Sequence, residues 1–260
     1  MTKISGTIIT FNNEHLIEDC ITSLKKICDE IVVVDSLSTD STRDIAENLG
    51  AKVIKQKFLG DGPQKKLAST LTSNNWVFSL DADERLEDDL INFVKNLNLN
   101  DSKFDGYAFK RRNYCGKKWI KAGGFYPDIV TRLYDKRLAN YHDSTSHSFV
   151  TASKIKKNSF HITHYTYSSY TDWVQKINFY SSQSAKTLHI KGVKPSRIRP
   201  VTHAIFAFFK KLFIKGAIFQ GLDGFTVALT TMFNTYMKYI KLNELYDNQA
   251  DPSKHFPKKD

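Results

Sequence analysis

The chain has 260 residues, of which 41% are hydrophobic and 13% aromatic, enough to bury the core of one large domain with an appendage. Three cysteines, odd in number and without metal-ligand spacing, argue against a disulfide scaffold or a cysteine-based zinc site and fit a reducing cytoplasm. The formal net charge of +11 is uneven, because residues 1–100 carry −5 while 101–185 and 186–260 carry +8 each. The basic second part therefore predicts a polyanionic partner: nucleic acid, an anionic membrane or a phosphorylated substrate.

The N-terminus starts with a strand-like run and lacks the basic and apolar regions of a signal peptide, so we expect a cytoplasmic protein. Residues 224–237 are uncharged, but these 14 residues fall short of the roughly 20 that span a bilayer. The apolar residues 203–209, followed by Lys210 and Lys211, have two interpretations. They fit a helix that lies in a membrane surface, or a helical lid that packs on the main domain, and both can hold.

The first half of the chain alternates strand and helix patterns. Strands are predicted from apolar and β-branched runs at Ile4–Thr10, Glu30–Asp35, 53–54 and Trp76–Leu80. Helices are predicted between them at Glu14–Lys26, 39–49 and Pro63–Thr72. This alternation predicts an α/β fold with a mostly parallel sheet and helices on both faces. Ligands bind such sheets beyond the C-terminal strand ends, so the polar residues after the first, second and fourth strands should converge at one edge.

Three acids follow the fourth predicted strand: Asp81, Asp83 and Glu84. Mg²⁺ and Mn²⁺ prefer hard oxygen ligands, usually one or two carboxylates together with the phosphates of a substrate. An Asp-x-Asp pair at a strand end therefore predicts a divalent-cation site of a nucleotide or nucleotide-sugar enzyme. The alternative interpretation is a solvated acidic loop.

The pattern changes after residue 104. Two antiparallel strands are predicted at 107–112 and 129–134, and the chain after Phe160 reads as helical and aromatic. We therefore expect a nucleotide-binding catalytic domain over residues 1–155, a helical, aromatic and basic extension over 156–247 that lies close to the membrane, and a disordered tail over 248–260.

Four motifs of the first half resemble family 2 glycosyltransferases of the GT-A fold. They are residues 8–14 (IITFNNE), 31–42 (IVVVDSLSTDST), 64–66 (QKK) and 80–84 (LDADE). Four later motifs are similar to the lipopolysaccharide inner-core β-1,4-glucosyltransferases of Gram-negative bacteria: residues 123–128 (GGFYPD), 132–134 (RLY), 164–167 (HYTY) and 176–181 (KINFYS). The resemblance covers roughly residues 3–245, and its early motifs are the more specific.

The resemblance implies transfer of glucose from UDP-glucose to a heptose of lipid A–core, with inversion at the anomeric carbon. It implies that Asp35 holds the uridine in a pocket lined by Thr10 and Asn12. It also implies that Asp81 contacts the ribose or a metal-bound water, and that Asp83 ligates Mg²⁺ or Mn²⁺ on the diphosphate. A cation at this place stabilises the charge of the departing UDP.

Basic residues at two places have alternative interpretations. Lys65, or its neighbour Lys66, could place a second positive charge near phosphate, or could belong to an exposed helix face. Arg132 could bind the diphosphate or an acceptor phosphate, or pair with a nearby acid.

An inverting transfer needs a base that deprotonates the acceptor hydroxyl. Relatives usually have Val-His-Glu where this chain has Ser146-His147-Ser148, so the acid is absent. Asp128 is the first candidate for the base, and Asp143 and His147 follow.

The predicted partners are a UDP-sugar, a phosphorylated lipid A–core acceptor and the anionic cytoplasmic face of the inner membrane. Alternatives are another UDP-sugar or surface-glycan acceptor, and a protein that binds the nucleotide sugar without catalysis. A nucleic-acid partner is not expected, because the basic segments carry no recognisable binding motif.

Overall fold

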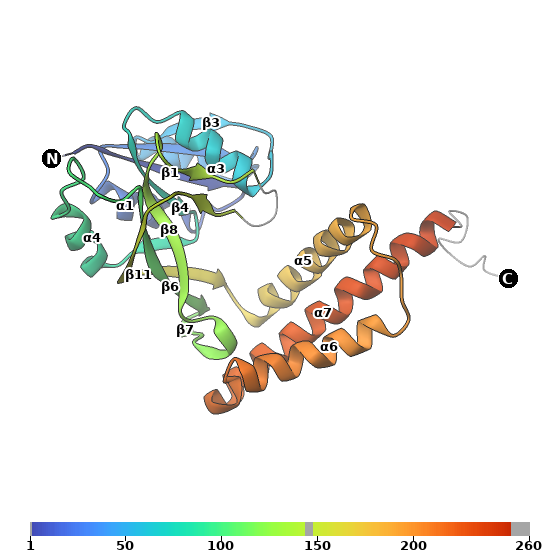
Figure 1. The fold of residues 1–260 in the computed structure, drawn as a ribbon. Coiled ribbons are helices and arrows are strands. Elements are labelled where there is room, and N and C mark those ends of the chain that lie inside the picture. The colour runs from blue at the N-terminus through green and yellow to red at the C-terminus, as the bar shows by residue number, and fades with distance from the viewer. Residues whose placement is uncertain (1, 144–147, 251–260) are drawn as a thin grey trace. The chain divides into compact units, whose positions relative to one another are not determined.

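The computed structural model describes residues 2–143 and 148–250, which form two compact units (Figure 1). The first unit contains residues 2–113 and 127–166, and the second contains residues 114–126 and those after 166. Each unit is built around its own core, so each is described by itself.

A mixed sheet forms the centre of the first unit. Its parallel half consists of β3 (Lys52–Lys55), β2 (Glu30–Asp35), β1 (Ile4–Thr10) and β4 (Trp76–Asp81), in this order. The sheet continues from β4 through β8 (Asp128–Asp135), β6 (Gly106–Cys115), β11 (Ile155–Tyr167) and β5 (Glu84–Leu86). The β4–β8, β8–β6 and β11–β5 pairings are antiparallel. The strand β6 also pairs in antiparallel fashion with the short strand β7 (Lys118–Trp119). The predicted α/β class with a parallel first half is confirmed.

Alternation along β4 assigns the two faces of the sheet. Trp76, Phe78 and Leu80 belong to the larger core, together with apolar residues of α1 (Ile17–Lys25), α2 (Thr42–Asn48) and α4 (Asp88–Lys95). Val77 points to the other face, where it joins a smaller cluster with Tyr134 and residues of β9 (Asn140–Tyr141) and β10 (Val150–Thr151). The helix α3 (Asp61–Thr70) covers this second face and brings Lys65 to the ring of Tyr141. Helices therefore lie on both faces, as expected.

Three elements of the first unit differ from the sequence-based expectation. The segment after Phe160 was expected to be helical, but β11 runs from Ile155 to Tyr167 and pairs with β5, which the sequence also did not indicate. β11 is polar at its start and mostly half-buried, so its strand conformation comes from pairing within the sheet rather than from a local pattern. The helix α4 was likewise not predicted.

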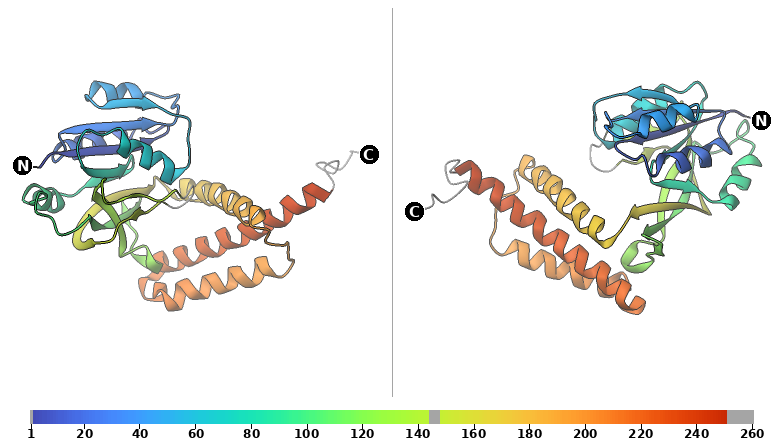
Figure 2. Two further views of the ribbon diagram at one scale, coloured as in Figure 1. Left: turned by 45° about the horizontal axis from the view of Figure 1, so that its top comes forward. Right: turned by 180° about the vertical axis from the view of Figure 1, so that it is seen from behind.

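The second unit is a set of long helices. The helices α5 (Tyr170–Ile190), α6 (Arg199–Phe209) and α7 (Gly221–Ala250) run side by side in every view (Figures 1 and 2). A π-helical turn, Lys210–Ile214, and a 3-10 turn, Ala217–Gln220, connect α6 to α7. A small core of Trp173, Ile177, Val227 and residues 115–122 holds them to the 114–126 segment.

These units revise the expected domain boundaries. Residues 156–166 belong to the sheet of the first unit, and residues 114–126 belong to the second unit. The expected tail began at residue 248, but α7 continues to Ala250. Residues 251–260 lie outside the described part of the chain.

Candidate functional site

The loops that follow β1 and β2 are tied together at the C-terminal edge of the parallel strands. The backbone N–H of Asn12 donates to Ser38 Oγ at 2.8 Å, and Asn12 Oδ1 accepts from the backbone N–H of Thr39 at 2.8 Å. Thr10, at the end of β1, is buried, and its hydroxyl accepts from Asn13 Nδ2 at 3.3 Å. Two of the predicted nucleotide-binding residues, Thr10 and Asn12, thus lie together with the turn after Asp35.

The turn after β2 is organised by Asp35, whose side chain is fully buried. One carboxylate oxygen accepts from the backbone N–H of Ser38 at 2.9 Å, the other accepts from the Ser38 hydroxyl, and Arg43 Nε lies 3.8 Å away. Asp35 is therefore at the expected edge of the sheet, but its carboxylate is buried and stabilises the turn, so it is not exposed to a ligand.

Two non-glycine residues in the described chain have positive φ, and both lie in these loops: Asn12 at 50° and Leu37 at 67°. A left-handed conformation costs roughly 1–2 kcal/mol for a residue with a side chain, and such strain concentrates at functional sites. The tie between the two loops holds both residues in this conformation.

Apolar side chains also gather at the same strand ends. Phe11 follows β1, Leu37 follows β2, and Phe58 and Leu59 follow β3, and each is about half exposed. Parallel strands bring these loops to one edge. The flat face of a nucleobase needs apolar walls of this kind.

Asp81, at the end of β4, lies between two buried cations. Its Oδ1 is 2.7 Å from Lys65 Nζ of α3, and its Oδ2 is 2.6 Å from Arg132 of β8. Burial alone would raise the pKa of Asp81, but Arg132 and Lys65 outweigh it and hold that pKa well below its usual value. Burial would likewise lower the pKa of Lys65, but Asp81 outweighs it, so this pKa is raised and the amine stays charged. Both oxygens of Asp81 are therefore engaged within the protein.

The ion-pair network continues into the antiparallel half of the sheet. Arg132 also contacts the fully buried Glu84 at 2.5 Å, and Glu84 in turn is 3.0 Å from Arg111. Arg111 then pairs with Asp128 at 2.7 Å. The predicted residues Lys65, Asp81, Arg132 and Asp128 thus belong to one chain of alternating charges.

Asp83 lies beside His164 of β11, because β5 and β11 are paired here. The backbone N–H of Tyr165 donates to the carbonyl oxygen of Asp83 at 2.9 Å, and Asp83 Oδ2 is 3.4 Å from His164 Nε2. Asn113 approaches the other ring nitrogen, with its Oδ1 2.6 Å from His164 Nδ1. Since the Asn113 amide donates to Asp128 at 3.2 Å, its Oδ1 faces the imidazole, and Nδ1 must carry the proton.

His164 Nε2 and the Asp83 carboxylate lie 3.4 Å apart, a separation at which either a proton on Nε2 or a divalent cation between the two groups would satisfy both. Two ligands of one octahedral ion lie roughly 3 Å apart, so the spacing fits. No cluster of three His, Cys, Asp or Glu residues suited to a metal occurs in residues 2–143 and 148–250, so substrate atoms would have to complete the coordination.

The predicted metal role thus fits Asp83 better than Asp81, whose oxygens are bound to Lys65 and Arg132. His161 and His164 are three residues apart on β11, so their side chains face opposite sides of the strand. His161 contacts Arg112 instead, at 3.3 Å.

Two of the three candidate bases, Asp128 and Asp143, contact different partners. Asp128 is 28% exposed and is held by Arg111 and Asn113. Asp143 is 67% exposed and pairs with Lys66 at 3.1 Å. His147 lies outside the described residues.

Asp61, which the sequence did not single out, lies where the missing acid would be. Ser148 occupies the position of the relatives' Glu, and its hydroxyl donates to Asp61 and accepts from Lys65 Nζ at 3.1 Å. Asp61 itself is 3.2 Å from Lys65. Asp61 escaped sequence reasoning because it acquires its neighbours only through the packing of α3, and the contact of His164 with Asp83 likewise depends on the β5–β11 pairing.

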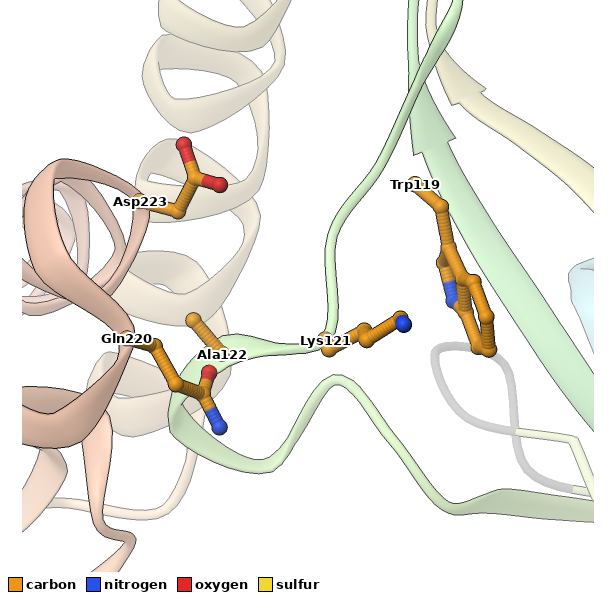
Figure 3. A pocket seen from close by; sticks show the side chains of 5 residues that line it. All are labelled: Trp119, Lys121, Ala122, Gln220 and Asp223. Atoms are coloured by element: carbon orange, nitrogen blue, oxygen red, sulfur yellow. The ribbon is translucent and has the colours of Figure 1, made fainter.

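The second unit has a hollow of about 340 Å³ (Figure 3). Lys121 extends towards Trp119 and lies 4.1 Å from the centre of its ring, and Gln220 and Asp223 line another side. Aromatic, amide and charged side chains of this kind can contact polar, partly apolar molecules such as sugars.

The comparisons with known proteins identify the class of this molecule. The family described as "Glycosyl transferase family 2" matches residues 5–163, which include β1 to β5 and most of β11. A glycosyltransferase of Rickettsia bellii is 38% identical over 256 residues, covering 94% of this chain and 87% of the relative. The chain belongs to glycosyl transferase family 2.

Two further proteins are similar over almost the whole chain. The "Lipopolysaccharide core biosynthesis glycosyltransferase LpsC" of Rhizobium meliloti is 25% identical, covering 96% of this chain and 95% of that protein. The structure of S. aureus TarS 1-349 in complex with UDP covers 95% of this chain at 14% identity, with a TM-score of 0.49.

Proposed function

We propose that this glycosyltransferase moves a hexose from a UDP-sugar, with glucose as the first choice, to a heptose of the lipopolysaccharide inner core, with inversion. The observation that carries the proposal is the edge where the Asn12 and Asp35 loops, the Asp81 ion pairs and the Asp83–His164 pair follow neighbouring strands. The printed name of LpsC supports the choice of acceptor.

The loops after β1, β2 and β3 are suited to the uridine. Phe11 and Leu37 offer apolar surface for the base, and Asn12 offers a side-chain amide held by the turn after Asp35. In this arrangement Asp35 acts through the turn that it organises, and Thr10 supports the neighbouring loop.

The diphosphate requires positive charge. The fixed cations Lys65 and Arg132 are buried and paired with Asp81, so the charge that faces the diphosphate would come from a divalent ion held by Asp83 and His164, Mn²⁺ in preference to Mg²⁺ because one donor is an imidazole. When bound, this ion stabilises the negative charge of the leaving UDP. The fixed cations remain charged at neutral pH because their acidic neighbours raise their pKa.

The transfer itself is a displacement at the anomeric carbon. The acceptor oxygen forms a bond to this carbon, the bond to the diphosphate oxygen breaks with its electron pair, and the hydroxyl proton passes to a carboxylate. We assign this carboxylate first to Asp128, since it is partly exposed and is linked through Asn113 to His164. The carboxylates of Asp61 and Asp143 and the imidazole of His147 are the alternative bases.

Mass spectrometry of the core oligosaccharide tests the proposal directly. Cells that lack the protein should produce a core shorter by one hexose, and purified protein with UDP-glucose and Mn²⁺ should restore that hexose on the isolated acceptor. Parallel reactions with UDP-galactose and UDP-N-acetylglucosamine identify the donor, because pocket contacts discriminate sugars that differ in the orientation of one hydroxyl or by an acetamido group. An unchanged core would contradict the proposed acceptor, and UDP binding without transfer would favour a binding protein without catalysis.

A further inference from the structure

One side of α7 is apolar and exposed along most of the helix. Its residues follow spacings of three and four, which keeps them on one face: Leu222, Phe225, Leu229, Phe233, Tyr236 and Ile240. Each of these side chains is at least 36% exposed, and Leu222 reaches 78%. A helix of a globular unit normally buries such a stripe against its own core, so this one is unpartnered within the described second unit.

The neighbouring helix α6 carries a matching stripe. Ile198, Val201, Ile205 and Phe209 follow the same spacing, and each is at least 48% exposed. The buried side of α6, which includes Ala204, faces the bundle. The ring of Phe208 in α6 lies 5.9 Å from the ring of Phe225, so the α7 stripe borders α6 at this residue. We call the two exposed stripes together the α6–α7 face.

The turn between the two helices extends this surface. Phe213 and Ile214 end the π-helical segment, and Phe219 follows in the 3-10 turn, where its side chain is 89% exposed. Lys211, by contrast, turns inward and donates to the carbonyl oxygen of Gly123 at 2.7 Å. The apolar side chains of the turn therefore face outward while at least one of its lysines does not.

The charge along most of α5, α6 and the turn has a single sign. The 50 residues from 173 to 222 contain nine Lys and Arg and no Asp or Glu. This stretch covers most of α5, all of α6 and the turn. An apolar face with a basic and acid-free surround is complementary to a surface that is apolar within and anionic at its rim.

The length and bend of the helices indicate whether they would cross a bilayer or lie in its interface. Within residues 2–143 and 148–250, no single helix is both long and apolar enough to cross a membrane. The pair Arg199–Ile214 and Ala217–Asp247 passes the length and composition test together, but it is bent by 69°. A bent pair with one apolar face suits a position in the plane of the interface better than a straight crossing.

We propose that the α6–α7 face inserts into the interfacial region of an anionic lipid bilayer, with the basic residues of 173–222 at the headgroups. This is more specific than the membrane interaction expected from sequence, because it names the inserted face and its depth, the headgroup and upper acyl layer. The inference is independent of the proposed donor and acceptor.

A second copy of this chain could also cover an apolar helix face. It fits less well, because two copies of the surrounding surface would bring eighteen basic and no acidic residues of 173–222 towards each other. Anionic lipid neutralises that charge, and each Lys or Arg near such a surface strengthens binding to it.

Vesicle flotation of the full-length protein tests the proposal. Vesicles of phosphatidylethanolamine with phosphatidylglycerol should carry the protein, and vesicles of phosphatidylcholine alone should carry much less. The double variant Ile205→Ser/Phe233→Ser removes one apolar side chain from each helix, both already exposed. We expect its binding to fall at least about tenfold, since each lost contact weakens partitioning severalfold.

The matched control is Leu138→Ser/Phe149→Ser, which removes two side chains, 62% and 55% exposed, from the first unit. The control should float as the wild type does, and circular dichroism should show unchanged helix content in both variants. Light scattering of the wild type without lipid should give a monomer. Wild-type protein that stays unbound, a face variant that floats normally, or a dimer that the face variant dissociates would each overturn the proposal.

Discussion

Lys65 and Asp81 form a 2.7 Å ion pair between α3 and the end of β4, although the lysine is only 4% exposed. This contact fixes the helix over one face of the sheet to the strand that carries the acidic motif. A buried pair is expensive to break, because removing one partner leaves the other charge without compensation. The donor edge therefore depends on charges that also stabilise the first unit.

Replacing Lys65 by Met should consequently destabilise the protein by about 3–5 kcal/mol, as the Asp81 carboxylate would lose one of its two cations. Urea unfolding at neutral pH measures the effect. Lys66→Met is the control, since Lys66 is 44% exposed and its pair with Asp143 should contribute less than about 1 kcal/mol. Equal losses in the two variants would contradict the structural role of the buried pair.

The same network predicts the acid sensitivity of the protein. Burial opposes the charge of Asp81, but Arg132 and Lys65 lower its pKa below the ordinary value of 3.8. A carboxyl group with a depressed folded-state pKa contributes stability that is present above 3.8 and is lost as pH falls below it. The free energy of unfolding should thus decrease as the pH falls below about 4, and this decrease should be shallower in the variant Asp81→Asn. An equally steep decrease in that variant would assign the acid response to other groups.

The first half of the fold could be predicted from the sequence because its signals are local. The buried run 30–35 is recovered residue for residue as β2, and Ile4–Thr10 as β1. β11 could not be predicted, since its polar residues adopt a strand only by pairing with β5. The helix α1 begins at Ile17, three residues later than the apolar pattern suggested.

In the candidate site, the residues at the ends of the parallel strands could be predicted from the sequence, but several of their partners could not. Topology alone brings Thr10, Asp35 and Asp81 to one edge, and the structure has them there. Partners that depend on antiparallel pairing or side-chain direction were out of reach. His164 meets Asp83 only through the β5–β11 register, and Asp61 meets Ser148 only because α3 packs beneath the loop before β10.

The Asp83–His164 pair predicts metal-dependent nucleotide binding. Asp83→Ala and His164→Ala should each weaken UDP binding in Mn²⁺ by at least about tenfold, and should change it little when the metal is chelated. Titration calorimetry with and without Mn²⁺ measures both quantities. His161→Ala is the control, because it lies on the same strand but contacts Arg112. Metal-independent losses would instead indicate a structural role for the pair.

The base can be identified by comparing three Asp→Asn variants. Asp128→Asn should lower kcat by about 10²–10⁴ while UDP affinity stays near that of the wild type. Asp143→Asn should remain within a few-fold, since this residue is 67% exposed and contacts Lys66 only at the surface. A large kcat loss in Asp61→Asn instead would transfer the role to the acid that binds Ser148.

The backbone of Asn12 offers a test of the loop that would meet the nucleotide. Its φ of 50° favours glycine or asparagine, and its Oδ1 accepts from the Thr39 N–H at 2.8 Å. Asn12→Gly loses the hydrogen bond but keeps the conformation, whereas Asn12→Ala loses the hydrogen bond and adds about 1 kcal/mol of strain. Both should weaken UDP binding, and the alanine variant should be the less stable of the two in urea unfolding. Equal stability would mean that the loop relaxes out of the left-handed conformation, and a wild-type affinity for UDP in both variants would remove Asn12 from the donor site.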